Sequence, residues 1–309
     1  MDPRKGNESQ EWVTSGVLVT GGAGYVGARL CQRLAQNKKT VVSLYRTQLP
    51  EARDNIFPVC SNLDSPDLLA APLRGVATVF HAAWVNSIRS PAESNIAGLK
   101  NLLAAVEKSE VKRFVFISAL GAEKNSDSKF LAEKYAAEQL VLAANIPEIV
   151  VVRPALLFGE GSDQGLLVRS ILKLMRAPLL YPVPKAPGSY YPLFLKDLVD
   201  FLIKIESTEL SMRRTIVEIA GIEAYKVSEL FRLVSSGFMP SAKLPIGSFF
   251  GEWLVPLFER EQTPLEGSSI REVLKLNKSP EMRTKENNPL ARVLPDHFHS
   301  FRDAMTLKP

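Results

Sequence analysis

Residues 17–27 read Val-Leu-Val-Thr-Gly-Gly-Ala-Gly-Tyr-Val-Gly, and this stretch limits the fold more than any other part of the chain. A β-branched apolar run enters a glycine-rich turn, and a segment with helical character leaves it. Gly21 and Gly22 permit a tight turn, and Gly27 lets the following helix pack against the strand. Gly24 keeps the approach to the turn open. Because free N–H groups and the helix dipole favour an anion there, the stretch predicts a binding site for the pyrophosphate of a dinucleotide.

Strand-like and helix-like segments alternate along the chain up to residue 154, which implies a parallel sheet with right-handed crossovers. Beyond residue 154 the alternation weakens, and prolines cluster between 178 and 192. We therefore predict an α/β fold, a doubly wound parallel sheet of the Rossmann type with a small C-terminal lobe. Three parts are expected: a flexible N-terminus over 1–12, a dinucleotide-binding domain over 13–221 with lobe insertions after 154, and a C-terminal lobe over 222–309. Strands are expected at 16–20, 40–45, 56–60, 76–82, 114–118, 149–152 and 215–219, and helices at 25–36, 92–108, 129–144 and 199–205.

The composition narrows the classes of partner. The chain has 309 residues and a net charge of +5, from 38 basic and 33 acidic residues. This mild excess suits a phosphate-bearing ligand, and no basic stripe with interleaved aromatics favours nucleic acid. The two cysteines, Cys31 and Cys60, fit a reducing compartment such as the cytoplasm, and no metal-ligand spacing is present. His297 and His299 are expected in a polar surface tail.

Two segments bear on membranes. Residues 1–11 are polar and of mixed charge, unlike a secretory signal, and no run of about 20 apolar residues predicts a transmembrane span. Residues 248–258 are rich in aromatic and aliphatic side chains, among them Phe249, Phe250 and Trp253. They fit either a peripheral contact with a membrane or a protein complex, or a helix buried over the ligand cleft. The expected location is the cytoplasm, either free or peripheral to a membrane.

The end of the second expected strand bears on the choice of dinucleotide. A chain that binds NAD usually has an acidic residue there for the ribose 2′-hydroxyl, whereas a chain that binds NADP has a positive charge. Here no acidic residue occurs before Glu51, and the planar fork of Arg46 suits a 2′-phosphate. NADP(H) is therefore favoured over NAD(H), with a solvated loop arginine as the alternative. Asn62 and Leu63, after the third strand, are expected to border the adenine.

Further motifs along residues 17–221 carry a family resemblance. They are Thr20-Gly21-x-x-Gly24-x-x-Gly27, His81-Ala82-Ala83, Asn95-x-x-Gly98-x-x-Asn101, Phe114-Val115-Phe116-Ile117-Ser118, and Val151-Val152-Arg153-Pro154 with Phe158-Gly159. In these the chain resembles the extended and atypical short-chain dehydrogenase/reductases, a group that includes sugar-nucleotide epimerases and dehydratases. The resemblance implies that a nicotinamide dinucleotide contacts Thr20, Gly21, Gly22, Gly24, Tyr25, Val26, Gly27, Arg46, Asn62, Leu63, His81, Ala82, Ala83 and Lys134.

The catalytic positions of that family are only partly present. In catalytic members a Tyr and a Lys four residues later share one helix face, and the ammonium lowers the pKa of the phenol. Here Lys134 fits the lysine position, but Phe130 takes the tyrosine position, and Tyr135 lies about 140° around the helix from it. The serine that orients the substrate falls on Ala119, with Ser118 one place early and on the other face of a strand. Lys134 and Ser118 are the candidate catalytic residues.

Three shorter sequence segments indicate a particular branch of this family. Residues 117–122 and 217–221, together with Glu138-Gln139, resemble an atypical branch that includes the nucleotide-binding accessory subunit of respiratory NADH:ubiquinone oxidoreductase and its bacterial relatives. That resemblance implies a structural role for bound NADPH. Two hypotheses follow. The first is an NADP(H)-binding protein with a degenerate catalytic site, structural or associated with a complex. The second is an active NADPH-dependent reductase, or a nucleotide-sugar epimerase or dehydratase, that uses Lys134 and a non-standard acid.

Overall fold

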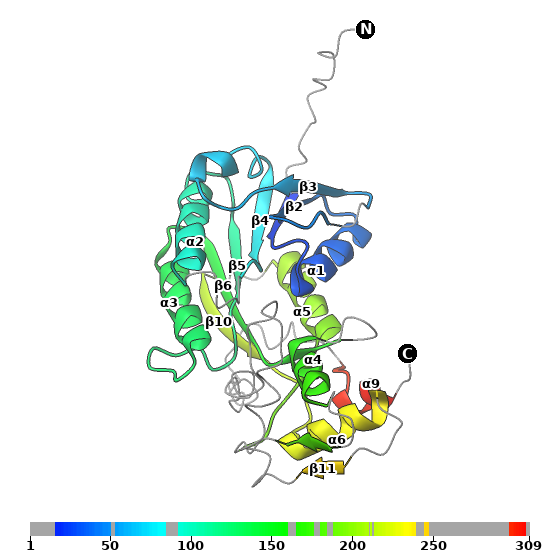
Figure 1. Ribbon diagram of the computed structural model, residues 1–309. Coiled ribbons are helices and arrows are strands. Elements are labelled where there is room, and N and C mark those ends of the chain that lie inside the picture. Colours follow the sequence, from blue (N-terminus) through cyan, green and yellow to red (C-terminus); the bar gives the residue numbers. More distant parts are fainter. Residues whose placement is uncertain are drawn as a thin grey trace.

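The computed structural model describes residues 16–50, 53–84, 92–159, 165–175, 180–183, 188–209, 211, 213–238, 244–246 and 297–306, and every structural statement below concerns these residues. The N-terminus over 1–12 and the aromatic segment over 248–258, about which we made predictions above, lie outside them. So does much of the predicted C-terminal lobe. The described elements form a helix-flanked sheet with a second, smaller group of helices and short strands beside it (Figure 1).

Seven of the described strands form one sheet in which all paired neighbours are parallel. Its order is β10-β6-β5-β4-β1-β2-β3, so the chain starts in the middle, winds to one edge and then crosses to the other. This doubly wound order confirms the predicted fold class and leaves a crevice at the carboxyl ends of β1 and β4, where the winding reverses. The strands are β1 (Gly16–Thr20), β2 (Val41–Tyr45), β3 (Ile56–Cys60), β4 (Val76–His81), β5 (Arg113–Ile117), β6 (Glu148–Pro154) and β10 (Arg214–Ile219).

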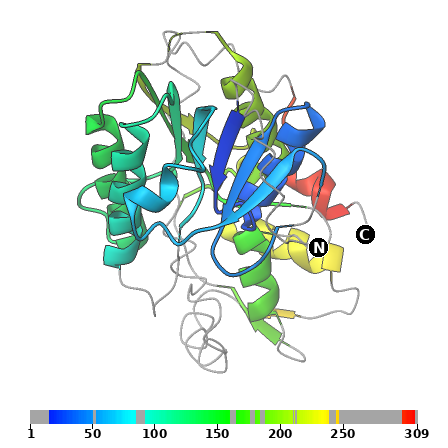
Figure 2. The same ribbon diagram turned by 90° about the horizontal axis from the view of Figure 1, so that it is seen from above.

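Helices cover both faces of the sheet. On one face lie α1 (Tyr25–Gln36) and α5 (Leu195–Ser207), and on the other α2 (Ala92–Val106) and α3 (Lys129–Ala143) (Figures 1 and 2). Because side chains of a strand alternate between faces, Val17 and Val19 of β1 join the core under α1 and α5, whereas Leu18 joins the core under α2 and α3. The sheet is thus buried on both sides, and its strands are accordingly almost wholly apolar.

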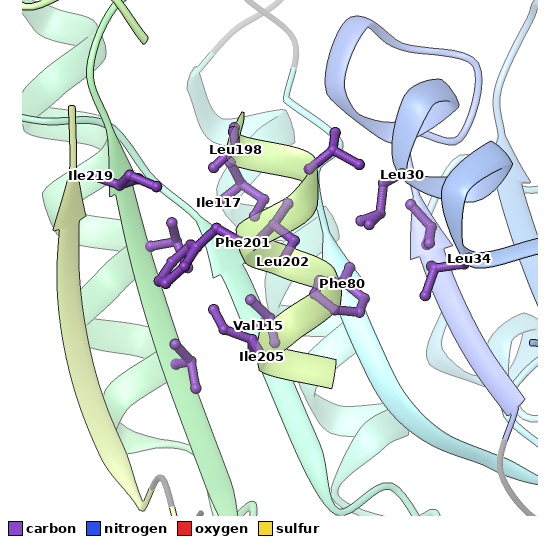
Figure 3. Close-up of a cluster of buried hydrophobic side chains, with 14 of the residues drawn as sticks. Leu30, Leu34, Phe80, Val115, Ile117, Leu198, Phe201, Leu202, Ile205 and Ile219 are labelled. Atoms are coloured by element: carbon purple, nitrogen blue, oxygen red, sulfur yellow. The ribbon is translucent and has the colours of Figure 1, made fainter. Parts of the chain in front are cut away.

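The α5 helix is the clearest case of a helix held by its apolar stripe. Its buried residues include Leu198, Phe201, Leu202 and Ile205, spaced three and four apart. Figure 3 shows them directed at residues of β4 and β5, among which Phe80 is fully buried. The sequence analysis predicts this helix only from residue 199, whereas the structure begins it at Leu195, and Leu195 and Leu198 already belong to its buried stripe.

A second hydrophobic cluster holds the smaller lobe together. It contains Phe158, Tyr190, Phe231 and Phe301, all with at most 1% of their surface exposed. The cluster joins parts of the chain on both sides of residue 221, so insertions after 154 and residues after 221 share one core. The elements of the smaller lobe are β7 (Leu157–Phe158), α4 (Gly165–Leu174), β8 (Leu180–Pro182), β9 (Leu193–Phe194), α6 (Val227–Phe238), β11 (Leu244–Ile246) and α9 (Phe301–Thr306). The boundary at residue 221 remains a prediction.

A polar contact fixes the chain before α9 to the sheet domain. The backbone N–H of His299 donates to Asp197 Oδ2 at 2.7 Å, and its Nδ1 lies 2.5 Å from Asp197 Oδ1. Asp197 is 2% exposed, whereas the ring of His299 remains partly exposed and packs on Phe194. His297 and His299 are both exposed, as expected for a polar surface tail, and His299 also makes a contact with Asp197, about a hundred residues earlier in the chain.

The pairing of Asp197 with His299 predicts a specific loss of stability. Asp197→Ala leaves two donors of His299 without their acceptor, so we expect the free energy of unfolding to fall by about 1–3 kcal/mol, measured by urea denaturation. Asp200→Ala is the control, because its ion pairs with Arg33 and Lys196 are exposed and should contribute less than about 1 kcal/mol. Equal losses for the two variants would contradict a supporting role for the His299 contact.

Candidate functional site

A cavity of about 750 Å³ opens at the carboxyl ends of β1, β2, β3 and β4. Its volume lies in the range of small-molecule sites, and its place is the crevice where doubly wound folds bind ligands. Most of the predicted cofactor residues line it: Thr20, Gly21, Gly24, Tyr25, Val26, Gly27, Arg46, Asn62, Leu63, His81, Ala82 and Ala83. Gly22 and Lys134 are not among its lining residues. A smaller cavity of about 310 Å³, between α1 and α5, lies away from these strand ends.

The glycine turn forms the floor of the cavity. Gly21 has φ +68°, a left-handed conformation that favours glycine, and a Cβ there would lie 2.8 Å from Ala83 Cα. A Cβ on Gly27 would overlap the Gly21 carbonyl oxygen, and one on Gly22 would overlap the hydroxyl of Ser43 on β2. Gly24 precedes α1, and no side-chain hydrogen bond caps that end of the helix. The glycines therefore let the turn pack tightly against β2, the segment after β4 and α1, and the uncapped start of α1 borders the cavity, where a pyrophosphate would fit.

One end of the cavity lies over β2 and β3. Arg46 is exposed at its rim, and Asn62 is hydrogen-bonded to Asp64. Leu63 has φ +62°, and the side chain of Asn101 on α2 donates to its carbonyl at 2.9 Å. A Cβ on Gly98 would lie 3.3 Å from Leu63 Cβ, so this glycine lets the Leu63 loop rest on α2.

The Asn95-x-x-Gly98-x-x-Asn101 motif thereby acquires a physical meaning that sequence reasoning missed. Its glycine and second asparagine lie one turn apart on the face of α2 that meets the Leu63 loop. The spacing of three residues was the available signal, since it places a small residue and a donor on one helix face.

The other end of the cavity lies over β4. Ala83 N donates to Thr20 Oγ1 at 3.2 Å, and that hydroxyl lies 2.7 Å from His81 Nδ1. Burial, with the nearby charge of Lys134, lowers the pKa of His81 to about 3, and its ring stacks on Phe116. His81 is therefore neutral at physiological pH, and it fixes the backbone of the cavity wall rather than exchanging protons.

Lys134 lies behind this wall, in an aromatic surround. Its ammonium is 3.9 Å from the ring centroid of Trp84, 4.9 Å from that of Phe116 and 5.8 Å from that of Phe130. It donates to the carbonyl oxygen of Ile117 at 2.8 Å and is 4% exposed. Burial lowers the pKa of Lys134 to about 7, against the neighbouring carboxylates, which favour the charged form.

The contacts of the Lys134 ammonium differ from those in the tyrosine–lysine pair described above. Among the described residues its partners are three aromatic rings and one backbone carbonyl, and none is a tyrosine. Trp84, which lines the cavity, covers the amine. Its indole Nε1 is buried and makes no hydrogen bond among the described residues.

Comparison with known proteins supports what the geometry indicates. The model of the NAD dependent epimerase/dehydratase family matches residues 17–185, which is more than half of the chain. The chain belongs to this family. The match begins at the first strand and includes the glycine turn, the cavity wall and both residues 130 and 134.

Individual relatives of the family are distant. A 2-alkyl-3-oxoalkanoate reductase of Stenotrophomonas maltophilia is 30% identical over 174 residues, which cover 48% of this chain and 52% of that protein. Subunit 9 of the NADH dehydrogenase [ubiquinone] 1 alpha subcomplex, a mitochondrial protein of Dictyostelium discoideum, is 25% identical over 272 residues, 80% of this chain and 73% of that protein. With the bacterial reductase and steroid dehydrogenase relatives, the chain aligns over only about half of their length.

Solved structures agree on the fold. UDP-glucose 4-epimerase from Thermotoga maritima superposes with a TM-score of 0.62 at 19% identity, covering 84% of this chain and 96% of that one. In the part of the chain that the structure describes, no helix is long and apolar enough to cross a membrane. Nor do the described histidine, cysteine and acidic side chains gather into a group of three that could hold a metal ion.

The family's substrate-orienting serine has no counterpart at the cavity. Ser118 directly follows β5, and its hydroxyl donates to Glu138 Oε1 at 2.5 Å. Arg153 binds the same carboxylate through Nε at 2.9 Å and Nη2 at 2.7 Å, and its Nη1 reaches Glu218 at 3.3 Å. This buried network joins β5, α3, β6 and β10. That Ser118 takes part in catalysis remains a prediction; in the structure its hydroxyl is bound to Glu138.

Glu138 is fully buried and Glu218 is partly exposed, although both accept from Arg153. Glu138→Gln removes the bidentate partner of a half-buried guanidinium, so we expect the free energy of unfolding to fall by about 3 kcal/mol. Glu218→Gln, the matched control on the same arginine, should cost less than about 1 kcal/mol. Urea denaturation of both variants measures the difference, and a smaller loss for E138Q than for E218Q would refute the ranking.

Proposed function

We propose that this chain binds NADP(H) in the cavity over β1–β4 and holds it without efficient proton-coupled turnover. One observation carries the proposal: the Lys134 ammonium is covered by Trp84 and bound to the Ile117 carbonyl, and Phe130 stands where catalytic relatives have tyrosine. A dinucleotide at this site would meet an intact cradle but no phenol from residue 130 to deliver a proton. Loss of a general acid typically costs about 10²–10⁴-fold in rate.

The residues that would hold the dinucleotide follow from the cavity. The turn at Gly21 and Gly24 would receive the pyrophosphate at the start of α1. Arg46, exposed at the rim of β2, would pair with a 2′-phosphate. The Leu63 loop would border the adenine. When bound, the dinucleotide supplies a nicotinamide able to carry hydride; the chain's own part is to bind and orient it.

We further propose that the protein acts as a component of a larger assembly. Support comes from the similarity to a mitochondrial subunit of NADH dehydrogenase, which extends over 80% of this chain. A location in a reducing compartment, peripheral to a membrane complex, agrees with the two free cysteines. In that setting a tightly bound dinucleotide stabilises the folded state: ligand at 100 times its Kd contributes about 2.7 kcal/mol.

A second candidate function is that of an NADPH-dependent reductase. The observation that favours it is the pKa of Lys134, lowered by burial to about 7, which suits a general acid at neutral pH. The similarity to the reductase of Stenotrophomonas maltophilia points the same way. For the amine to act, the indole of Trp84 has to move away from it.

Purification of the protein followed by extraction of bound nucleotide tests the proposal. We expect NADPH to be recovered, added NADPH to raise the melting temperature, and absorbance of the reduced nicotinamide to stay constant with carbonyl substrates. Steady oxidation of NADPH that disappears in Lys134→Ala would instead establish the reductase. Lys129→Ala, on the exposed face of the same helix, is the control for that variant.

Arg46 tests the choice of dinucleotide. Arg46→Glu replaces a cation beside the expected 2′-phosphate by an anion, so we expect the affinity for NADPH to fall at least about tenfold while that for NADH changes little. Fluorescence titration of the two reduced dinucleotides gives both constants. Equal losses of affinity for NADPH and NADH would show that Arg46 does not distinguish a 2′-phosphate from a 2′-hydroxyl.

A further inference from the structure

The two ends of the cavity differ in charge. At the β2–β3 end the lining contains the charged residues Arg46 and Asp64, whereas the lining at the β4 end consists of His81, Ala82, Ala83 and Trp84. His81 is neutral, for the reasons given above. Behind the indole of Trp84 lies the Lys134 ammonium, 3.9 Å from the ring centroid.

The cavity also has a direction. With the pyrophosphate over the glycine turn and the 2′-phosphate beside Arg46, as the proposed function has it, the adenosine half lies over β2 and β3. The nicotinamide half then extends to the β4 end, toward Trp84. The two redox forms of the dinucleotide differ there by a full charge, because the oxidised nicotinamide ring is cationic and the reduced ring is neutral.

We propose that the Lys134 ammonium, held behind Trp84, makes this pocket select the reduced dinucleotide over the oxidised one. The inference rests on the proposed function and adds the redox state of the ligand to it. A cationic ring at the β4 end has to approach a buried cation across an aromatic wall, which screens far less than water. The neutral ring has no such cost.

Two carboxylates of α3 lie near Lys134 and favour its charged form, but each has another partner. On α3, Glu138 is engaged by Arg153 through both carboxylate oxygens, and Glu133 is bound to Asn95. From β5 the ammonium meets the Ile117 carbonyl and the ring of Phe116, and on the β4 side it meets neutral His81 and the indole of Trp84. The described residues place no carboxylate oxygen within ion-pair distance of Nζ.

Trp84 reinforces the discrimination. The face of an aromatic ring attracts cations through its quadrupole, and an exposed indole at a nicotinamide site would favour the oxidised form. Here the Lys134 ammonium already occupies that interaction. A second cation therefore gains less from the indole than it would from a free tryptophan.

The experiment compares the dissociation constants of NADPH and NADP⁺, the first by fluorescence titration and the second by displacement of bound NADPH. We expect the wild-type protein to bind NADPH about tenfold more tightly. Lys134→Met keeps an unbranched apolar chain inside the aromatic surround and removes the charge, so the ratio of the two constants should fall several-fold. Lys129→Met, on an exposed position of the same helix, should leave the ratio unchanged.

Measuring the two dissociation constants of the unmodified protein as a function of pH is an independent test. Burial lowers the pKa of Lys134 to about 7, so the ammonium is present below that pH and is lost above it. The preference for NADPH should therefore be larger at pH 6.5 than at pH 8.5. Titration of the 2′-phosphate, near pH 6, is common to both dinucleotides and cancels in the ratio.

The outcomes separate the two proposals. If both dinucleotides bind and their ratio is the same in wild type, K134M and across the pH series, the redox selection is refuted while dinucleotide binding stands. If neither binds to the wild-type protein, the proposed function itself fails. Should K134M not fold, the pH series on the wild-type protein decides alone.

Discussion

Burial of one ammonium group organises the region around the cavity. Lys134 leaves water for a space bounded by Trp84, Phe116 and Phe130, which is costly for a charge that has no carboxylate in contact. The Ile117 carbonyl and the aromatic faces offset part of that cost. Because the carbonyl belongs to the last residue of β5, the amine also fixes where that strand ends. Fold and site are therefore coupled through this one buried side chain.

The fold was predictable because each of its signals is local. The strand–turn–helix over 16–36 is found with the expected bounds, since β-branched residues, glycines and a helical stripe act within a few positions of one another. The alternation of strands and helices sufficed to predict a doubly wound parallel sheet, given right-handed crossovers. The smaller lobe was not predictable to the same degree. Its strands β7, β8, β9 and β11 are two or three residues long, too short to show a period.

The candidate site likewise has a part that local sequence signals predicted and a part that depends on tertiary packing. Twelve of the predicted cofactor residues line the cavity because the motif and the strand ends place them there, whereas their contacts with a dinucleotide remain predictions. The sequence predicted that Phe130 replaces a tyrosine but had no means of showing what surrounds Lys134. Likewise, Ser118 was a candidate only through its place in a strand. Its bond to Glu138, and that of Glu138 to Arg153, depend on how β5, α3 and β6 pack, which no local pattern encodes.

If the pocket holds a dinucleotide without a proton donor, as we propose, its retention has a structural rationale. The cavity is bounded by the glycine turn after β1, the Leu63 loop after β3 and the His81–Trp84 segment after β4, which meet above the sheet but belong to different crossovers. A ligand that contacts all three ties together segments that the sheet alone leaves as separate loop ends. Its binding free energy is then added to the stability of the fold, independent of any chemistry. An aromatic surround that hides the amine serves such a role, because it keeps the wall of the cavity closed whether or not a proton is available.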